Sequence, residues 1–175
     1  ISFEQRLKSG SALFGKVSAV ASYTAGTDAF DASNTGRITL EEGYLGYRSQ
    51  FADDWNIEAT LGPRVLMLGT GMLIANGSAD GFERGALKFG PREAWEMAGV
   101  LQISQEGVKA TAFYLDTNEL ASSDTGNRLG GIDLRWDGDH GGYAGLTYLR
   151  VLESEAAYPQ AAAGGVGAPV IIAGA

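Results

Sequence analysis

The chain has 175 residues, no cysteine, 26 glycines, only 4 prolines and a formal net charge of −8. The lack of cysteine excludes disulfide scaffolds and thiolate metal sites, and the acidic balance argues against a nucleic-acid-binding protein. No run approaches the ~18–20 consecutive apolar residues of a membrane-spanning helix, and the many glycines favour strands and tight turns.

Apolar and polar residues alternate along eight segments, and this period of two predicts β-strands with two unlike faces. The predicted strands are residues 1–8, 12–24, 37–50, 55–67, 95–104, 108–116, 128–137 and 142–153. The fourth strand, WNIEATLGPRVLM, shows the alternation over most of its length: Ile57 and Leu61 share an apolar face, while Glu58 and Arg64 lie on the other. In the third strand the alternation is confused, and a bulge at Gly43 is expected to shift its register.

The connections between these strands alternate between short and long. This rhythm is typical of an up-and-down meander with tight turns at one end, as in transmembrane β-barrels. We therefore predict an all-β fold, an antiparallel up-and-down meander of about eight strands that forms part or all of a transmembrane β-barrel. Residues 1–155 are expected to be the N-terminal half of a larger barrel, and residues 156–175 an Ala/Gly-rich loop or tail.

Aromatic residues flank two of the short turns: Phe51 and Trp55 at one, Trp136 and Tyr143 at another. This placement suits the aromatic girdles found where a barrel meets the two membrane interfaces. The alternative is that aromatic residues simply favour strands and their ends. The charged faces of the strands need water or charged partners, which a hydrated lumen supplies, so the apolar faces are expected to contact lipid.

The segments LEEGYLGYRS, IEATLGPRVLMLGTGMLIANG, GALKFGPREAWEMAGVLQIS and VKATAFYLD resemble the alginate-export family of outer-membrane barrels. Gly62, Pro63 and Arg64 occupy the place of that family's GRQ segment, with departures at Pro63 and Val65. The strand at 95–103 is similar to the family's fDGVRL segment but lacks its Asp and Arg. The resemblance covers residues 37–116 and implies a barrel in the bacterial outer membrane that transports an anionic saccharide.

Arg64 is the first candidate for a pore residue, because it faces the predicted lumen on the strand that enters the longest connection. Its planar guanidinium suits the carboxylate or hydroxyl groups of a passing sugar. The alternative is an internal ion pair with Glu58 or with an acid on a neighbouring strand. The loop at 69–94 is expected either to fold inward and narrow the pore or to remain solvated. The candidate selectivity residues are Glu58, Arg64, Arg84, Arg92, Lys109, Asp133 and Arg135.

No pattern in the sequence predicts catalysis. Glu41 and Glu42 are consecutive in a strand and are expected to point to opposite faces, so they do not form a two-carboxylate site. We predict a channel rather than an enzyme, with no cofactor and no metal. Its expected partners are the lipid bilayer, lipopolysaccharide and a small-molecule or oligosaccharide solute, with no nucleic acid. The alternative is a soluble antiparallel β-sheet binding module.

Overall fold

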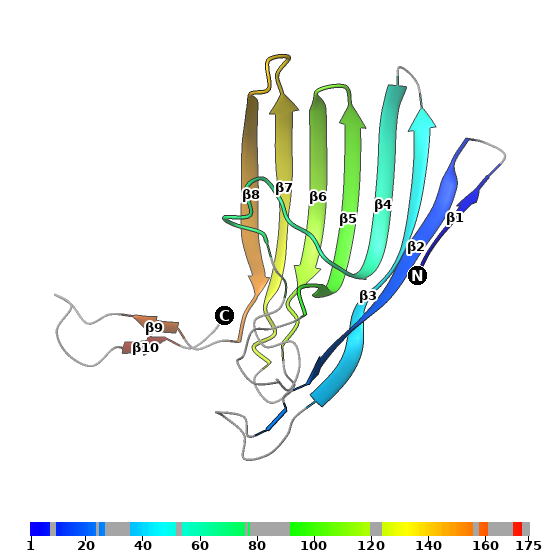
Figure 1. Cartoon of the computed structure of the whole chain (residues 1–175). Helices are drawn as coiled ribbons and strands as arrows, with labels where there is room; N and C mark the ends of the chain where they lie inside the picture. Colours follow the sequence, from blue (N-terminus) through cyan, green and yellow to red (C-terminus); the bar gives the residue numbers. More distant parts are fainter. Residues whose placement is uncertain are drawn as a thin grey trace.

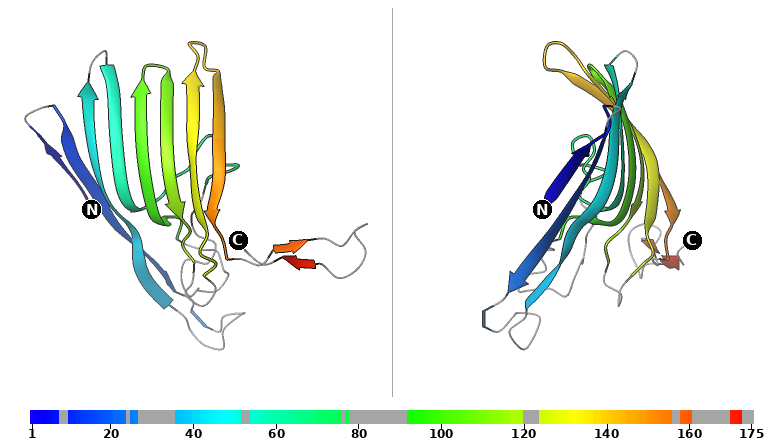
Figure 2. Two further views of the ribbon diagram at one scale, coloured as in Figure 1. Left: turned by 180° about the vertical axis from the view of Figure 1, so that it is seen from behind. Right: turned by 90° about the vertical axis from the view of Figure 1, so that its right-hand side faces the viewer.

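The computed structural model is a single curved sheet of eight antiparallel strands in chain order, each bonded to the next (Figures 1 and 2). It describes residues 1–7, 10–23, 25–26, 36–51, 54–75, 77, 92–119, 124–155, 158–160 and 170–172. The strands are β1 (Ser2–Arg6), β2 (Ala12–Tyr23), β3 (Gly36–Phe51), β4 (Trp55–Arg64), β5 (Trp95–Gln105), β6 (Val108–Asp116), β7 (Arg128–Asp137) and β8 (Tyr143–Glu153). The predicted all-β meander is confirmed, and every predicted strand is present.

The sheet is open, with β1 at one edge and β8 at the other (Figure 1). The short turns gather at one end of the strands and the long connections leave from the other (Figure 1). Within the predicted tail, β9 (Tyr158–Gln160) pairs with β10 (Val170–Ile172) as a separate antiparallel ribbon beyond the end of β8. No helix long and apolar enough to cross a bilayer occurs in the described part of the chain.

One face of the sheet, here called the outer face, is apolar and uncovered. Because antiparallel residues in register share a face, the pairing defines whole rows across the sheet. The central row on β2–β8 is Leu13, Tyr47, Ala59, Leu101, Ala112, Ile132 and Tyr148. Most large side chains of this face are exposed: Leu61 is 65% exposed and Leu146 is 68% exposed. No other described element of the chain packs over these rows.

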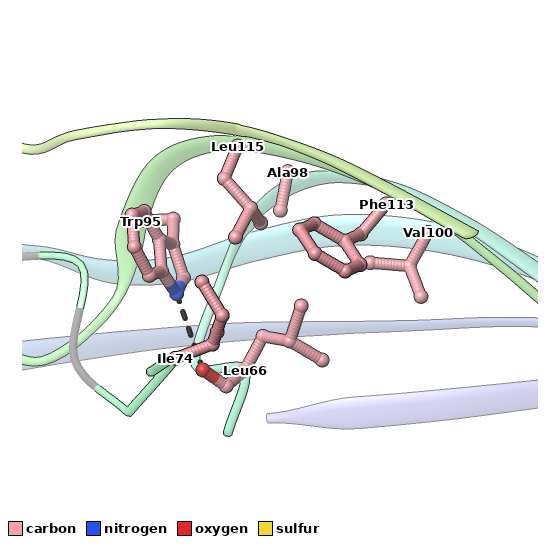
Figure 3. Close-up of a cluster of buried hydrophobic side chains, with 7 residues drawn as sticks. All are labelled: Leu66, Ile74, Trp95, Ala98, Val100, Phe113 and Leu115. Carbon is pink, nitrogen blue, oxygen red and sulfur yellow. Dashed lines mark hydrogen bonds between the residues drawn. The ribbon is translucent and has the colours of Figure 1, made fainter. Parts of the chain in front are cut away.

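The opposite, inner face divides into a polar and an apolar half. Toward the short turns, one row on β3–β8 reads Arg48, Glu58, Gln102, Thr111, Asp133 and Thr147. Toward the long connections, the inner positions become Val100, Phe113 and Leu149, then Ala98, Leu115 and Leu129. The core cluster forms on this apolar half (Figure 3): Leu66, Ile74, Trp95, Ala98, Val100, Phe113 and Leu115. The main core of the described chain therefore lies on the face that also carries the charges.

Two irregularities modify the predicted strands. The bulge in β3 lies at Glu41 rather than at Gly43, because Ser18 pairs with Glu42 while the next residue, Ala19, pairs with Leu40. β4 ends at Arg64, three residues earlier than predicted. Gly62 has a φ of 126° there, and the following Pro63 has no N–H for the ladder, so the chain leaves the sheet.

Replacing Gly62 with alanine is expected to lower the free energy of unfolding by about 2 kcal/mol, because the new methyl group meets backbone in a left-handed conformation. A Cβ at this position would lie 2.4 Å from the Gly43 carbonyl oxygen. The measurement is chemical denaturation followed by circular dichroism. Gly99→Ala is the matched control, since its Cβ has no neighbour closer than 3.8 Å. Equal effects of the two substitutions would contradict this account of the break in β4.

Candidate functional site

The chain that follows β4 turns back over the inner face. Residues 65–75 and 77, here called the inner segment, run across β6, β7 and β8 in Figure 1. Within it, the Leu68 N–H donates to the Ile74 carbonyl oxygen at 2.9 Å, which closes a small hairpin. The described part of the predicted inward loop therefore lies over the charged face. Residues 76 and 78–91 of that loop fall outside the described residues.

Several contacts fix the inner segment at both ends. The Trp95 Nε1–H donates to the Leu66 carbonyl oxygen at 3.2 Å in a buried site (Figure 3). Ile74 is only 1% exposed and packs in the core cluster. At the far end, Gly77 donates to the Glu93 carbonyl oxygen at 3.1 Å and accepts from the Asn118 N–H at 2.7 Å. The segment is thus part of the folded core rather than a loose surface loop.

Arg64 lies at the start of the inner segment, but not in the ion pair that the sequence suggested as an alternative. Its guanidinium donates to the Thr60 hydroxyl and stands 4.9 Å from the centre of the Tyr44 ring. Among the described residues it forms no salt bridge, and its buried Nε has no hydrogen-bond partner. The ring and the hydroxyl hold this arginine, and no carboxylate of the described part of the chain is paired with it.

Five of the predicted selectivity residues line one cavity of about 290 Å³ beneath the inner segment, here called the charged cavity. They are Glu58, Arg64, Lys109, Asp133 and Arg135. Lys109 is in register with Arg135, and the buried Asp133 accepts a hydrogen bond from the Thr147 hydroxyl at 2.6 Å. Arg135 pairs with Asp137 at 2.7 Å. With Asp137 counted, the carboxylates on this wall equal the cations in number, so the wall presents closely spaced charges of both signs.

Arg92, a sixth candidate, does not line this cavity. Arg92 donates to the Asn118 side-chain oxygen at 2.8 Å, and burial lowers the pKa of its guanidinium below the ordinary value. Its position just before β5 indicates a role in holding the connection between strands. Arg84 lies outside the described residues.

The four turn-flanking aromatics do not share one face. Phe51 and Trp55 are in register with each other on the outer face, and Trp136 lies there too, 58% exposed. Tyr143 instead pairs with Asp137 on the inner face, where its ring centre is 4.5 Å from the Arg135 guanidinium carbon. Alternation explains the difference, because the residue of β8 that faces Trp136 is Ala144, one position later.

Glu41 and Glu42 have a structural role that the sequence did not reveal. The prediction that they point to opposite faces is wrong, because the bulge interrupts the alternation between them. Glu41 accepts from the backbone N–H groups of Glu93 at 2.8 Å and Ala94 at 3.0 Å. Glu42 pairs with Lys16 and accepts from the Val65 N–H at 3.5 Å. Together the two carboxylates hold the backbone where β4 ends and β5 begins.

Comparisons of the chain with protein-family models, with curated proteins and with solved structures find no match. Among the described residues, no group of three or more His, Asp or Glu side chains is placed to hold a metal ion.

Replacing Trp95 with phenylalanine is expected to loosen the inner segment while leaving the sheet intact, because the Leu66 carbonyl loses its buried donor at a cost of about 1–2 kcal/mol. Native-state hydrogen exchange is the measurement. The Leu68 amide is expected to exchange faster, whereas amides of the β5–β6 ladder keep their protection. Trp136→Phe on the outer face is the control. Unchanged exchange at Leu68 would show that this hydrogen bond does not anchor the segment.

Proposed function

We propose that this sheet forms part of the wall of a bacterial outer-membrane β-barrel channel. Its outer face contacts lipid, and its inner face lines an aqueous lumen through which small solutes or anionic saccharides diffuse. The observation that carries the proposal is the outer face itself, a broad apolar surface that no described element covers. A contiguous apolar surface of this extent requires an apolar neighbour.

The dimensions of the strands support a membrane as that neighbour. β4 to β8 have 9 to 11 residues each, the length at which a tilted strand crosses the hydrocarbon layer. On the outer face, the charged residues Asp116 and Arg150 lie near the long connections. Trp136 and Trp55 lie near the short turns, as expected of interfacial aromatics.

The inner face supports a channel that selects by charge and size. The cations Arg64 and Lys109 line this face, Arg64 without a salt bridge among the described residues, and the inner segment narrows the passage. This pattern agrees with the anionic saccharide that the resemblance to alginate-export barrels implies. The proposed mechanism is diffusion past fixed charges and includes no bond-making step.

The soluble binding module predicted as an alternative requires a second layer over the outer face, since a two-layer arrangement is what buries such a surface in water. None of the described residues supplies that layer. Instead, the covering segment lies on the inner face, which carries the charged residues. A covered charged face and an uncovered apolar face are the reverse of what a soluble two-layer domain has, and this favours the channel.

Neighbouring positions on β5 provide a direct test of which face meets lipid. Because the chain has no native cysteine, Leu101→Cys and Gln102→Cys give one label each, on the outer and inner face respectively. In vesicles, a fluorophore at 101 is expected to be quenched by nitroxide lipids and one at 102 by aqueous iodide. The opposite pattern, or a chain that stays monomeric in water without detergent, would overturn the lipid-facing assignment.

Planar-bilayer recording of the full-length protein tests the pore. The expected result is a stable conductance with a preference for anions, which Lys109→Gln reduces. Lys16→Gln, whose ammonium group is paired with Glu42, is the control that keeps the preference. Vesicle insertion without conductance would mean that the sheet spans the membrane but does not form a channel.

A further inference from the structure

The inner segment presents apolar side chains to a face that is otherwise hydrated in the proposed channel. Met72 is 89% exposed and Leu73 is 64% exposed, both at the tip of the hairpin that Leu68 and Ile74 close. Leu66 and Ile74 of the same segment are buried in the core cluster. The segment therefore carries exposed apolar residues in addition to those that anchor it. Exposed apolar groups inside an aqueous passage indicate a surface that contacts an apolar part of a solute.

A second cavity lies beside this tip. It has a volume of about 420 Å³ and is here called the Tyr143 cavity. Met72 and Leu73 line it from the tip, and its lining from β7 and β8 includes Asp133, Arg135, Tyr143 and Thr147. This volume lies within the range of ~300–1,000 Å³ that is usual for small-molecule sites, and apolar walls with a few polar groups are their typical composition.

Arg135 belongs to both cavities, because it also lines the charged cavity with Lys109 and Arg64. Its guanidinium stacks on Tyr143 and binds Asp137 through Nε and Nη2. A guanidinium has five N–H donors, so this pairing leaves donors for a second carboxylate. A solute in the Tyr143 cavity therefore meets the apolar side chains of the tip and the remaining donors of Arg135, while the Asp133 carboxylate is occupied by the Thr147 hydroxyl.

We propose that the inner segment and β7–β8 form a binding site for small aromatic carboxylates. The ring lies between the Met72–Leu73 tip and Tyr143, and the carboxylate points to Arg135 and the charged cavity. This inference rests on the proposed function, since it needs the inner face to be aqueous. It deepens that function by naming a solute class that has an apolar body in addition to a negative charge.

Isothermal titration of the full-length protein in detergent tests the site with three probes: benzoate, glucuronate and benzyl alcohol. Benzoate has both the ring and the charge, glucuronate has the charge on a polar body, and benzyl alcohol has the ring without charge. Benzoate is expected to bind at least about tenfold more tightly than either of the others. Equal or tighter binding of glucuronate, equal binding of benzyl alcohol, or no binding of benzoate would each overturn the proposal.

One variant and a matched control isolate the contribution of the tip. Leu73→Ser is expected to weaken benzoate binding about tenfold without changing that of glucuronate, because it removes apolar contact alone. Because Leu73 is exposed, its replacement removes no side chain from the core cluster, and circular dichroism verifies the fold. Met97→Ser, at an exposed outer-face position that lines neither cavity, is the matched control. Equal loss in both variants, or no loss in Leu73→Ser, would contradict a role for the tip.

These outcomes are distinguishable from failure of the channel itself. Conductance and label quenching in vesicles are independent of the titration. A conducting protein that shows no preference for benzoate overturns only the binding site. A protein that binds benzoate as expected, but neither inserts in vesicles nor conducts, overturns only the proposed function.

Discussion

The strict alternation of side chains across a paired antiparallel sheet is the constraint on which this structure depends. Once the register is set, Leu61 and Leu101 must share a face, and Glu58 and Asp133 must share the other. Moving one large apolar side chain out of water contributes roughly 1.5–3 kcal/mol. Summed over the outer face, that contribution exceeds the net stability of about 5–15 kcal/mol typical of a folded domain. The medium around the outer face therefore decides whether the sheet is stable.

The same constraint explains why the inner segment follows a break in β4. A strand that continued regularly beyond Arg64 would alternate Val65 and Met67 onto the outer face. The positive φ of Gly62 and the missing N–H of Pro63 end the ladder, and the chain turns inward instead. Glu41 and Glu42 then hold the backbone on both sides of that break. The narrowing of the proposed lumen is thus a consequence of local backbone chemistry rather than of loop length.

Much of this arrangement is readable from the sequence, because alternation and turn spacing are local signals. All eight strands and the inward position of Glu58, Lys109 and Asp133 follow from periodicity. The exceptions arise where local periodicity fails. The bulge at Glu41 depends on pairing with β2, and the side of the sheet taken by Tyr143 depends on where the turn before β8 ends. The apolar half of the inner face cannot be predicted from periodicity for a different reason. The sequence places Phe113 and Leu115 in a strand, but only tertiary contact with Trp95 and Ile74 makes them a core.

The edges of the sheet add a further requirement. Along its free edge β8 bonds no other strand among the described residues, although its full length of 11 residues keeps the alternation of the sheet. In lipid, unpaired backbone N–H and C=O groups cost several kcal/mol each, so only closed arrangements of strands are stable there. If the outer face contacts lipid, the edges at β1 and β8 must therefore pair with further strands. The proposed channel therefore requires a further strand to pair with the open edge of β8. Once the sheet is closed in this way, the charged cavity faces an enclosed lumen.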